Sequence, residues 1–532
     1  MEISSYVSIA YLVLFLPAVI LLYGISPRRI RPYVLLLSSY AFFWSISGKL
    51  LIYLLLSTFS IHHTGAWLAL VQTERKGVLL QADKGEKKAI RTAYQKKLRR
   101  IVAFSVCLHI GILIVLKYSS FLGGNINALF SALHIPVAFT IPKYAVPIGL
   151  SFFTLQAVSY IFDVYREKIP ADKHLGRLAL FMAFFPQIME GPICRYQDTA
   201  LQLFKGAPIS YQNLTRGIQR ILFGLLKKIV IADRLNVFIQ NVFNGYAAYD
   251  GGIIALAAVL YTCQLYMEFS GTMDVVIASA EIFGITLPEN FRQPFFSRTI
   301  SEFWQRWHIT LGTWFKDYIF YPLSMSKPLK KLTSRARKKL GNHFGPLIAG
   351  SAALFAVWLC NGLWHGAGWN YIFFGMYHFA FILTGNIIEP LSRRITGSLH
   401  IRRDSFPWMA IQILRTGILV CIGELFFRAN GLAAGLAMFK IMITDFSLAS
   451  IQNGTVFTLG MDKRDFLITL IAMMIVFVNS ILKERGILPR QWLVTCRLPL
   501  RWAVYYGLIL FVIIFGAYGT GYVPVDPIYA NF

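Results

Sequence analysis

Apolar runs long enough to cross a membrane recur along the whole chain of 532 residues. A transmembrane helix needs about 20 consecutive, mostly apolar residues. Lipid offers the backbone no hydrogen-bonding partner, so such runs must be helical. The chain is 56% hydrophobic, which is more apolar side chain than a soluble protein of this length needs for its core. The sequence therefore predicts an all-α, polytopic membrane protein with about ten or eleven transmembrane helices, plus re-entrant or interfacial helices. Clear examples of the runs lie at residues 50–70, 101–116, 146–162, 409–427, 466–481 and 502–518.

The chain is strongly basic, with 52 Lys and Arg against 25 Asp and Glu and a net charge of +27. In a soluble protein this balance would suggest nucleic-acid binding, but here the basic residues concentrate in short segments between apolar runs. That is the positive-inside pattern, so membrane lipids are the expected partner and nucleic acid is not. Residues 75–100 hold ten Lys or Arg, and residues 327–339 hold seven. We expect both segments to be cytoplasmic, the first as a solvated, charged helix, and counting spans from them places the N- and C-termini outside.

Three segments organise the chain. We expect N-terminal transmembrane helices with a basic cytoplasmic loop, a catalytic core, and C-terminal transmembrane helices with an extracytoplasmic tail, at residues 1–100, 101–430 and 431–532. The core is irregular between residues 181 and 318, where short runs are interrupted by proline and glycine. One apolar run, residues 253–269, ends next to Glu268. Aromatic and charged residues mix over 300–318, which we expect to be one helix lying across a cavity or in the interface plane.

The stretch from Cys360 to Asn370 carries the most unusual chemistry. It lies between two apolar runs, so we expect His365 at the mouth of a helical hairpin. Ionisable groups at membrane depth are costly and usually functional, and the three glycines around His365 let backbone or ligand approach closely. Trp364 and Trp369 suit a membrane–water boundary. The alternative at this point is an interfacial histidine that only forms hydrogen bonds within its loop.

A second unusual histidine, His308, ends a short run of aromatic and charged residues. On one helix, Glu302 and Arg306 are four residues apart and can pair on one face, whereas Trp304 and His308 would share another face. His308 is therefore a candidate for catalysis or substrate contact. The six cysteines show no CxxC spacing, so we expect neither a disulfide framework nor a metal site.

Several motifs together resemble the membrane-bound O-acyltransferase (MBOAT) family, in its bacterial, alginate-type polysaccharide O-acetyltransferase branch. Each motif is moderately specific by itself, and together they are highly specific. Two positions depart from the family pattern: Glu268 stands where relatives carry Asp, and Glu190 stands where a small residue is usual. Either departure could change the lining of the tunnel. The motifs follow the family's order between about residue 100 and residue 430, at residues 147–156, 160–166, 184–187, 191–196, 224–228, 232–234, 287–291, 303–308 and 362–366.

The resemblance implies a ring of helices around a thinned membrane region with a central tunnel, in a bacterial cytoplasmic membrane. His365 would be the catalytic base, and His308 would also be needed. The donor would be acetyl-CoA or another acyl thioester that enters from the cytoplasm, with no bound cofactor. The acyl group, an acetyl group in this branch, would pass to an extracytoplasmic polysaccharide, with an SGNH or esterase-like acetyltransferase as the partner outside.

The chemistry of the residues agrees with this family. Acyl transfer from a thioester to a hydroxyl requires removal of the hydroxyl proton, and a neutral imidazole suits that task near pH 7. Such positioned proton transfer contributes about 10²–10⁴-fold. Asn361, Trp364 or glycine amides could donate to the developing oxyanion, whereas Trp304 and Glu268 would line the tunnel. Glu268 and Asp274 fit a polar network better than a catalytic role.

The sequence alone leaves two other functions possible. One is a proton-coupled transporter or flippase that uses both histidines, although no internal repeat is visible. The other is D-alanyl transfer to teichoic acid, but the extension past Phe427 favours the polysaccharide branch by analogy. The tail, residues 526–532, is largely apolar. Its Tyr529 either helps to plug the outer tunnel mouth or accepts the acyl group as a relay, after an imidazole activates its phenol.

Overall fold

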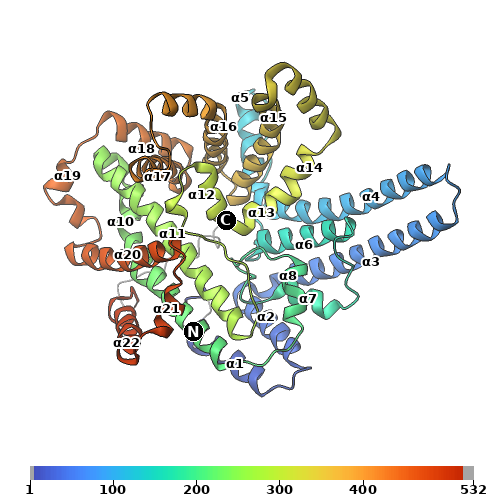
Figure 1. Ribbon diagram of the computed structural model, residues 1–532, viewed down its shortest axis with the longest axis horizontal. Helices are drawn as coiled ribbons and strands as arrows, with labels where there is room; N and C mark the ends of the chain where they lie inside the picture. The colour runs from blue at the N-terminus through green and yellow to red at the C-terminus, as the bar shows by residue number, and fades with distance from the viewer. Residues whose placement is uncertain (1–4, 519–532) are drawn as a thin grey trace. The chain divides into compact units, whose positions relative to one another are not determined.

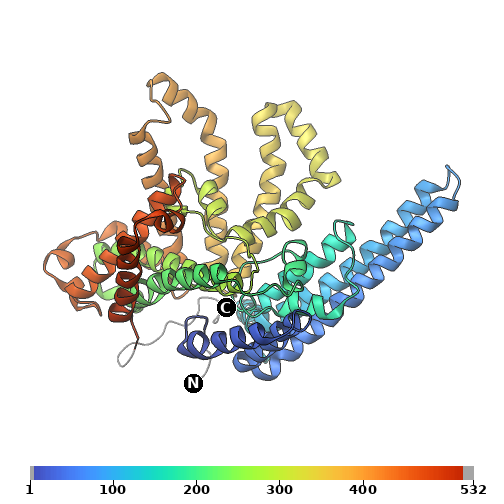
Figure 2. The same ribbon diagram turned by 60° about the horizontal axis from the view of Figure 1, so that its bottom comes forward.

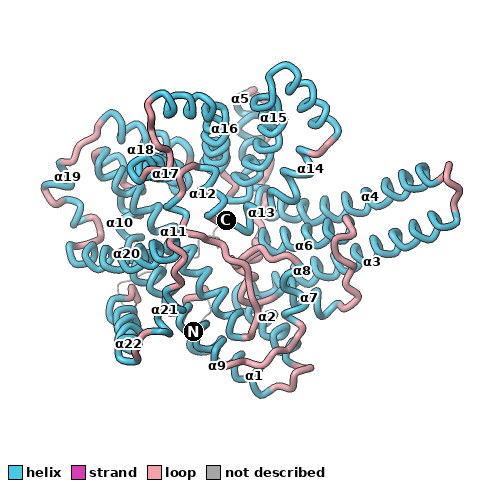
Figure 3. The backbone as a smooth tube through the Cα atoms, viewed as in Figure 1, coloured by secondary structure: helices cyan, strands magenta, loops and turns pink. Residues whose placement is uncertain are grey.

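The computed structural model describes residues 5–518, and regular structure in this range is helical (Figure 3). Within it, an isolated antiparallel bridge joins Phe291 to Trp307. The prediction of an all-α, multi-pass membrane protein is therefore confirmed. Residues 5–518 contain eight helical stretches that are long and apolar enough to cross a membrane, and two shorter apolar helical segments, Ala10–Ile25 and Leu432–Thr444. These stretches are Arg31–Gln81, Lys87–Ala132, Gly251–Ile282, Lys327–His365, Trp369–Ser398, Phe406–Arg428, Lys463–Glu484 and Leu498–Phe515.

The described chain divides into two compact units, residues 5–218 with Val276–Pro288, and Gln219–Val275 with residues 289–518. The three segments expected from the sequence stay a prediction. In the first unit, α3 packs on both α4 and α6, and α2 packs on α7. The helices that lie wholly in its first segment are η1 (Ala10–Phe15), α1 (Leu16–Ile25), α2 (Arg31–Ser47), η2 (Gly48–Leu50), α3 (Leu51–Gln81), α4 (Lys87–Leu113), η3 (Ile114–Tyr118), α5 (Ser119–Ala132), α6 (Leu150–Tyr165), α7 (Leu175–Ala183) and α8 (Tyr196–Leu203).

The irregular backbone that the interrupted sequence predicted follows α7, and it is buried within the first unit. The Phe185 backbone N–H donates to Ser39 Oγ at 3.0 Å, and the Met189 N–H donates to Tyr6 Oη at 3.1 Å. Tyr6 Oη in turn donates to the Phe185 carbonyl at 2.8 Å. Non-helical backbone at membrane depth is tolerated only where protein satisfies its polar groups, and these side chains do so.

The basic segment around residues 75–100 forms the end of a helical hairpin. Figures 1 and 2 show α3 and α4 running side by side as two blue helices to a short turn near residue 85. The segment is thus helical and largely exposed, as expected from its charged residues. Arg75 and Lys76 pair with Glu167, and Lys97 pairs with Glu74 at 3.1 Å. Exposed pairs of this kind contribute little to stability.

The second unit contains most of the long apolar helices. The helix α9 (Tyr211–Leu225) and α11 (Gly251–Ile282) each belong to both units. The others are η4 (Leu226–Ala232), α10 (Asp233–Asn244), α12 (Ile300–Arg306), α13 (Ile309–Phe315), η7 (Lys316–Phe320), α14 (Tyr321–Ser324), α15 (Lys327–His365), α16 (Trp369–Ser398), α17 (Phe406–Arg428), α18 (Leu432–Thr444), α19 (Ala449–Gln452), α20 (Lys463–Glu484), α21 (Pro489–Thr495) and α22 (Leu498–Phe515).

One helix extends beyond the run that the sequence suggested, and another is interrupted by a bend. The apolar run expected over 253–269 continues through Glu268 to Ile282, because the charged residues of α11 find ion-pair partners inside the protein. The basic start of α15 is not collinear with its apolar part. Gly341 adopts a left-handed φ of +77° and interrupts the helix. A Cβ on Gly345 would lie 2.4 Å from the Arg337 Cα, so the chain folds back tightly at this point.

Candidate active site

His365 is the last residue of α15, and α16 begins four residues later at Trp369. The predicted hairpin is therefore confirmed, with His365 at its turn. Glycine is required here by close packing between the two helices. A Cβ on Gly366 would lie 2.3 Å from the Tyr371 ring, and a Cβ on Gly375 would lie 2.3 Å from the Trp358 carbonyl oxygen. Because these positions lack side chains, α15 and α16 can approach each other closely near the turn that carries His365.

The imidazole of His365 is buried and surrounded by aromatic rings. Its ring centroid lies 5.0 Å from that of Trp364, 5.9 Å from Phe374 and 5.1 Å from Phe427. The three rings come from α15, α16 and α17, so the helix bundle fixes the orientation of the imidazole from several sides. An aromatic enclosure excludes bulk water, which strengthens local electrostatic interactions during a reaction.

His308 does not lie on a continuous helix, which corrects the expectation for residues 300–318. The helix α12 ends at Arg306, Trp307 is extended, and His308 adopts a left-handed backbone with φ +46° before α13 begins. The predicted ion pair between Glu302 and Arg306 is confirmed at 2.8 Å. The predicted shared face of Trp304 and His308 is wrong, because the helix ends between them. Non-glycine residues in this conformation are uncommon and often mark functional sites.

The two histidines come together around one tryptophan. The Trp364 ring lies 5.5 Å from the His308 ring and 5.0 Å from the His365 ring, between ring centroids. Phe269 of α11 also packs against the His308 ring, with 4.9 Å between the ring centroids. Burial lowers the pKa of His308 to about 3. Its imidazole is therefore neutral at physiological pH, the state in which it can accept a proton or a hydrogen bond.

Comparison with known proteins places this chain in a family. The sequence model of the membrane-bound O-acyltransferase family matches residues 47–337. The chain is 30% identical over 448 residues to a probable alginate O-acetylase of Pseudomonas syringae pv. tomato, covering 84% of this chain and 76% of the relative. A peptidoglycan O-acetyltransferase of Helicobacter pylori is 29% identical over 358 residues, covering 62% and 61%.

The chain belongs to the membrane-bound O-acyltransferase family. It is therefore an acyltransferase, as the motifs suggested. A more distant relative, a teichoic acid D-alanyltransferase of Bacillus subtilis, is 29% identical over 253 residues, covering 46% of this chain and 60% of the relative. The family match ends at residue 337, before His365.

The other predicted residues of this MBOAT protein separate into two groups. Asn361 lies buried one turn before His365 on α15, and Trp304 contacts Phe374, the ring that also touches His365, at 5.8 Å. Glu268 lies in a buried ion cluster, where Lys228 Nζ is 3.0 Å from its carboxylate. Their catalytic or lining roles stay predictions. Tyr529 lies outside the described residues.

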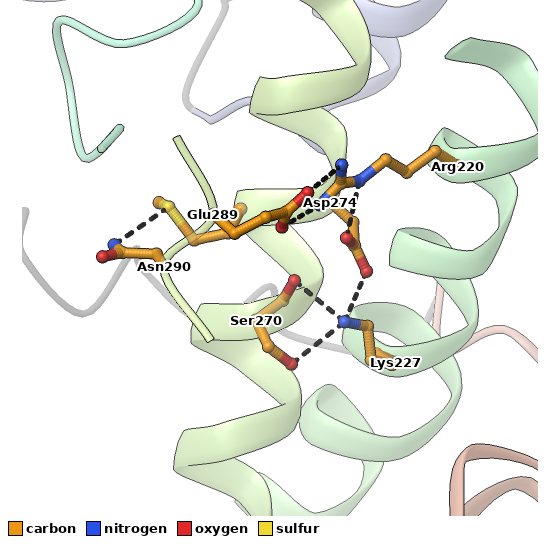
Figure 4. A network of polar contacts seen from close by, with 7 residues as sticks. Arg220, Lys227, Ser270, Asp274, Glu289 and Asn290 are labelled. Carbon is orange, nitrogen blue, oxygen red and sulfur yellow. Dashed lines mark hydrogen bonds and ion pairs between the residues drawn. The ribbon is translucent and has the colours of Figure 1, made fainter. Parts of the chain in front are cut away.

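The polar network expected around Asp274 is present, and it is built by a π-helix. Figure 4 shows Asp274 between Arg220 at 2.8 Å and Lys227 at 2.5 Å. The wider turn of η4 lets the consecutive residues Lys227 and Lys228 both reach α11, the second of them at Glu268. Such π-helical turns are rare and frequently occur at functional sites. The sequence showed the charges but not the local geometry that brings them together.

Sequence reasoning missed His378, a fully buried histidine on α16. Its ring lies 4.6 Å from Phe374, 4.8 Å from Trp304 and 5.4 Å from Trp358. The signal that could have found it is the one that found His365, an ionisable residue inside an apolar run. Its Nε2 packs against Gly423, where a Cβ would approach within 2.8 Å. His378 is part of the aromatic packing next to the site.

Proposed function

We propose that this acyltransferase moves an acetyl group from a cytoplasmic thioester, acetyl-CoA or a related donor, toward O-acetylation of an extracytoplasmic polysaccharide. The observation that carries the proposal is the buried His365 at the α15–α16 turn, whose neighbour Trp364 also contacts the His308 ring. Similarity to alginate and peptidoglycan O-acetyltransferases supports acetyl as the group and a polysaccharide as the acceptor. An SGNH or esterase-like acetyltransferase outside the membrane would complete the transfer.

His365 supplies the proton chemistry in this proposal. Its neutral imidazole removes the proton of the acceptor hydroxyl while the oxygen attacks the thioester carbonyl carbon. The negative charge that develops on the carbonyl oxygen is stabilised by a hydrogen-bond donor, for which the Asn361 amide one turn away is suitable. The carbon–sulfur bond then breaks, and the imidazolium returns its proton to the thiolate. The products are an ester and a free thiol.

Transfer itself can be tested with purified protein in proteoliposomes. We expect radiolabelled acetyl from acetyl-CoA to appear on an alginate oligosaccharide, with an extracytoplasmic acetyltransferase of the same organism present. A D-alanyl thioester of a carrier protein, tested in parallel with teichoic acid, should give no product. Transfer of D-alanine without transfer of acetyl would overturn the acetyl assignment and leave the family membership intact.

The proposal of a cytoplasmic donor assumes that the α3–α4 turn is cytoplasmic, and this orientation can be tested by cysteine labelling. Gly85 is exposed, and nothing lies within 4 Å of a Cβ built there, so Gly85→Cys should fold normally. In intact cells we expect this cysteine to resist a membrane-impermeant maleimide and to react after permeabilisation. Ala138→Cys lies in the exposed segment after α5, which follows the apolar run 101–116 and is therefore expected on the opposite side of the membrane from residues 75–100. It is the matched position that should react in intact cells. The reverse pattern would invert the topology.

A further inference from the structure

Asn290 is a buried amide in direct contact with the His308 turn. Its Oδ1 lies 3.3 Å from His308 Nδ1, and it accepts from the Thr310 backbone N–H at 3.1 Å and from Thr310 Oγ1 at 2.9 Å. At the other end of the amide, Nδ2 lies 3.5 Å from the Met273 thioether sulfur. Only 1% of Asn290 is exposed, so these contacts hold the amide without help from bulk solvent.

The direction of the amide follows from the chemistry of its neighbours. A backbone N–H can only donate, so the atom that meets the Thr310 N–H must be the amide oxygen. A thioether sulfur is a weak acceptor, which suits the NH₂ group at the opposite end. The oxygen only accepts, so His308 must donate to it. The proton of the neutral imidazole therefore sits on Nδ1, and Nε2 keeps its lone pair.

We propose that Asn290 is a positioning residue of the acyl-transfer site, which holds His308 in the Nδ1–H tautomer so that Nε2 presents an acceptor or base to the reacting groups. This inference rests on the proposed function, because it concerns how His308 takes part in acyl transfer. It assigns to Asn290 the orienting role that a carboxylate or carbonyl oxygen has for many functional histidines. The inference requires no contact between Asn290 and the substrate.

The backbone around Asn290 supports the same turn from both sides. The Asn290 carbonyl accepts from the Ile309 N–H at 3.0 Å, and the Arg292 N–H donates to the Arg306 carbonyl at 2.9 Å. Between these bonds, Phe291 and Trp307 form the isolated antiparallel bridge. Residues 290–292 thus bind the chain immediately before and after His308, which stabilises its left-handed backbone.

An ion network anchors the residue that precedes Asn290. Arg220 donates from Nη1 and Nη2 to the two carboxylate oxygens of Glu289, at 2.8 and 2.7 Å, and its Nε binds Asp274 (Figure 4). Asp274 binds Lys227, whose Nζ donates to the Ser270 carbonyl at 2.9 Å. Two cations and two carboxylates alternate, so the network balances its own charge. Bidentate pairs fix geometry as well as adding energy.

Most charged side chains on the described segments around His308 are held in ion pairs, which makes the pH dependence of the reaction easier to interpret. On α11, Glu268 pairs with Lys228 and Asp274 with Arg220 and Lys227. On α12, Arg306 pairs with Glu302 and with Glu484 of α20. On the 289–292 segment, Glu289 pairs with Arg220, and the Arg292 side chain is exposed. Among the described residues, His365 of α15 is a further titratable group near His308, because both rings contact the Trp364 ring.

The chain provides a matched control for a change at Asn290. Asn453 Oδ1 accepts from the Thr455 N–H at 3.0 Å and from Thr455 Oγ1 at 2.7 Å, in an exposed turn. Like Asn290, Asn453 thus accepts from both the backbone N–H and the hydroxyl of one threonine. Among the described residues, no histidine is in hydrogen-bonding contact with Asn453. Asn453→Asp changes a similar asparagine without changing the active site.

The experiment measures acyl-transfer rates of the full-length protein in nanodiscs between pH 5.5 and 8. Asn290→Asp keeps the acceptor and adds a negative charge beside Nδ1–H, which favours protonated His308. We expect the ratio of the rate at pH 5.5 to the rate at pH 8 to fall at least threefold relative to wild type. Asn453→Asp should keep the wild-type ratio. Asn290→Leu, which has similar size but no acceptor, should lose at least tenfold in kcat with little change in donor KM.

A double variant assigns the effect to the correct histidine. In a His308→Gln background, the residual rate should show the same pH ratio with and without Asn290→Asp. A wild-type pH ratio in Asn290→Asp, or a shift that persists without His308, would overturn the inference. Asn290→Asp is nearly isosteric, so this decision stands even if Asn290→Leu folds poorly. A wild-type protein that transfers no acyl group would instead overturn the proposed function.

Discussion

Replacement of His365 by alanine should lower acyl transfer by about a hundredfold or more, the scale of a lost general base. The imidazole is buried at the α15–α16 turn, and its ring touches Trp364, Phe374 and Phe427. No other side chain with a basic nitrogen occupies this turn, from Gly362 to Asn370. We expect the donor KM to change less than kcat, because the proton transfer occurs only in the transition state.

The matched control for this change is His343 on the same helix. Its ring is exposed and its Nε2 contacts the Asn386 carbonyl at 3.0 Å, away from the α15–α16 turn. His343→Ala should transfer acetyl at the wild-type rate. Both variants should purify as folded protein with wild-type gel-filtration profiles. A folded His365→Ala protein with full activity would refute the role of His365 as the base.

Replacement of His308 should also reduce transfer strongly, and two substitutions separate its possible roles. His308→Ala removes the ring, and we expect a loss of about a hundredfold. His308→Gln puts an amide oxygen near the former position of Nε2, which can accept a hydrogen bond but cannot take a proton. A transfer rate that is substantially higher in His308→Gln than in His308→Ala would identify Nε2 as an acceptor that orients a substrate. An equal loss of transfer rate in both variants would identify Nε2 as a base.

The backbone conformation of His308 calls for its own control. His400 also has a left-handed backbone, with φ +51°, but its side chain is exposed at the end of α16. His400→Ala and His400→Gln therefore impose the same substitution in the same conformation, without the active site, and should keep full activity. His308→Ala with normal donor binding and a wild-type rate would show that His308 only supports the structure.

Local sequence determined the class of fold and the position of His365. Hydropathy alone required helices, because lipid cannot satisfy an open backbone. The two apolar runs on either side of residues 360–370 were enough to predict a hairpin with His365 at its turn. The Glu302–Arg306 pair was also predictable, since residues four apart on a helix are neighbours. Each of these features depends on residues close together in the chain.

Tertiary structure alone decided how the histidines meet and how His308 is held. A helical pattern could continue past Arg306, but the pairing of Phe291 with Trp307 and the bonds from Asn290 stop it there. Asn290 is 18 positions from His308 in the chain, and Trp364 lies more than 50 positions beyond it. Periodicity reports only on neighbours along one element. The contacts that set a histidine's backbone, tautomer and enclosure come from segments that folding brings together, so the tertiary structure had to reveal them.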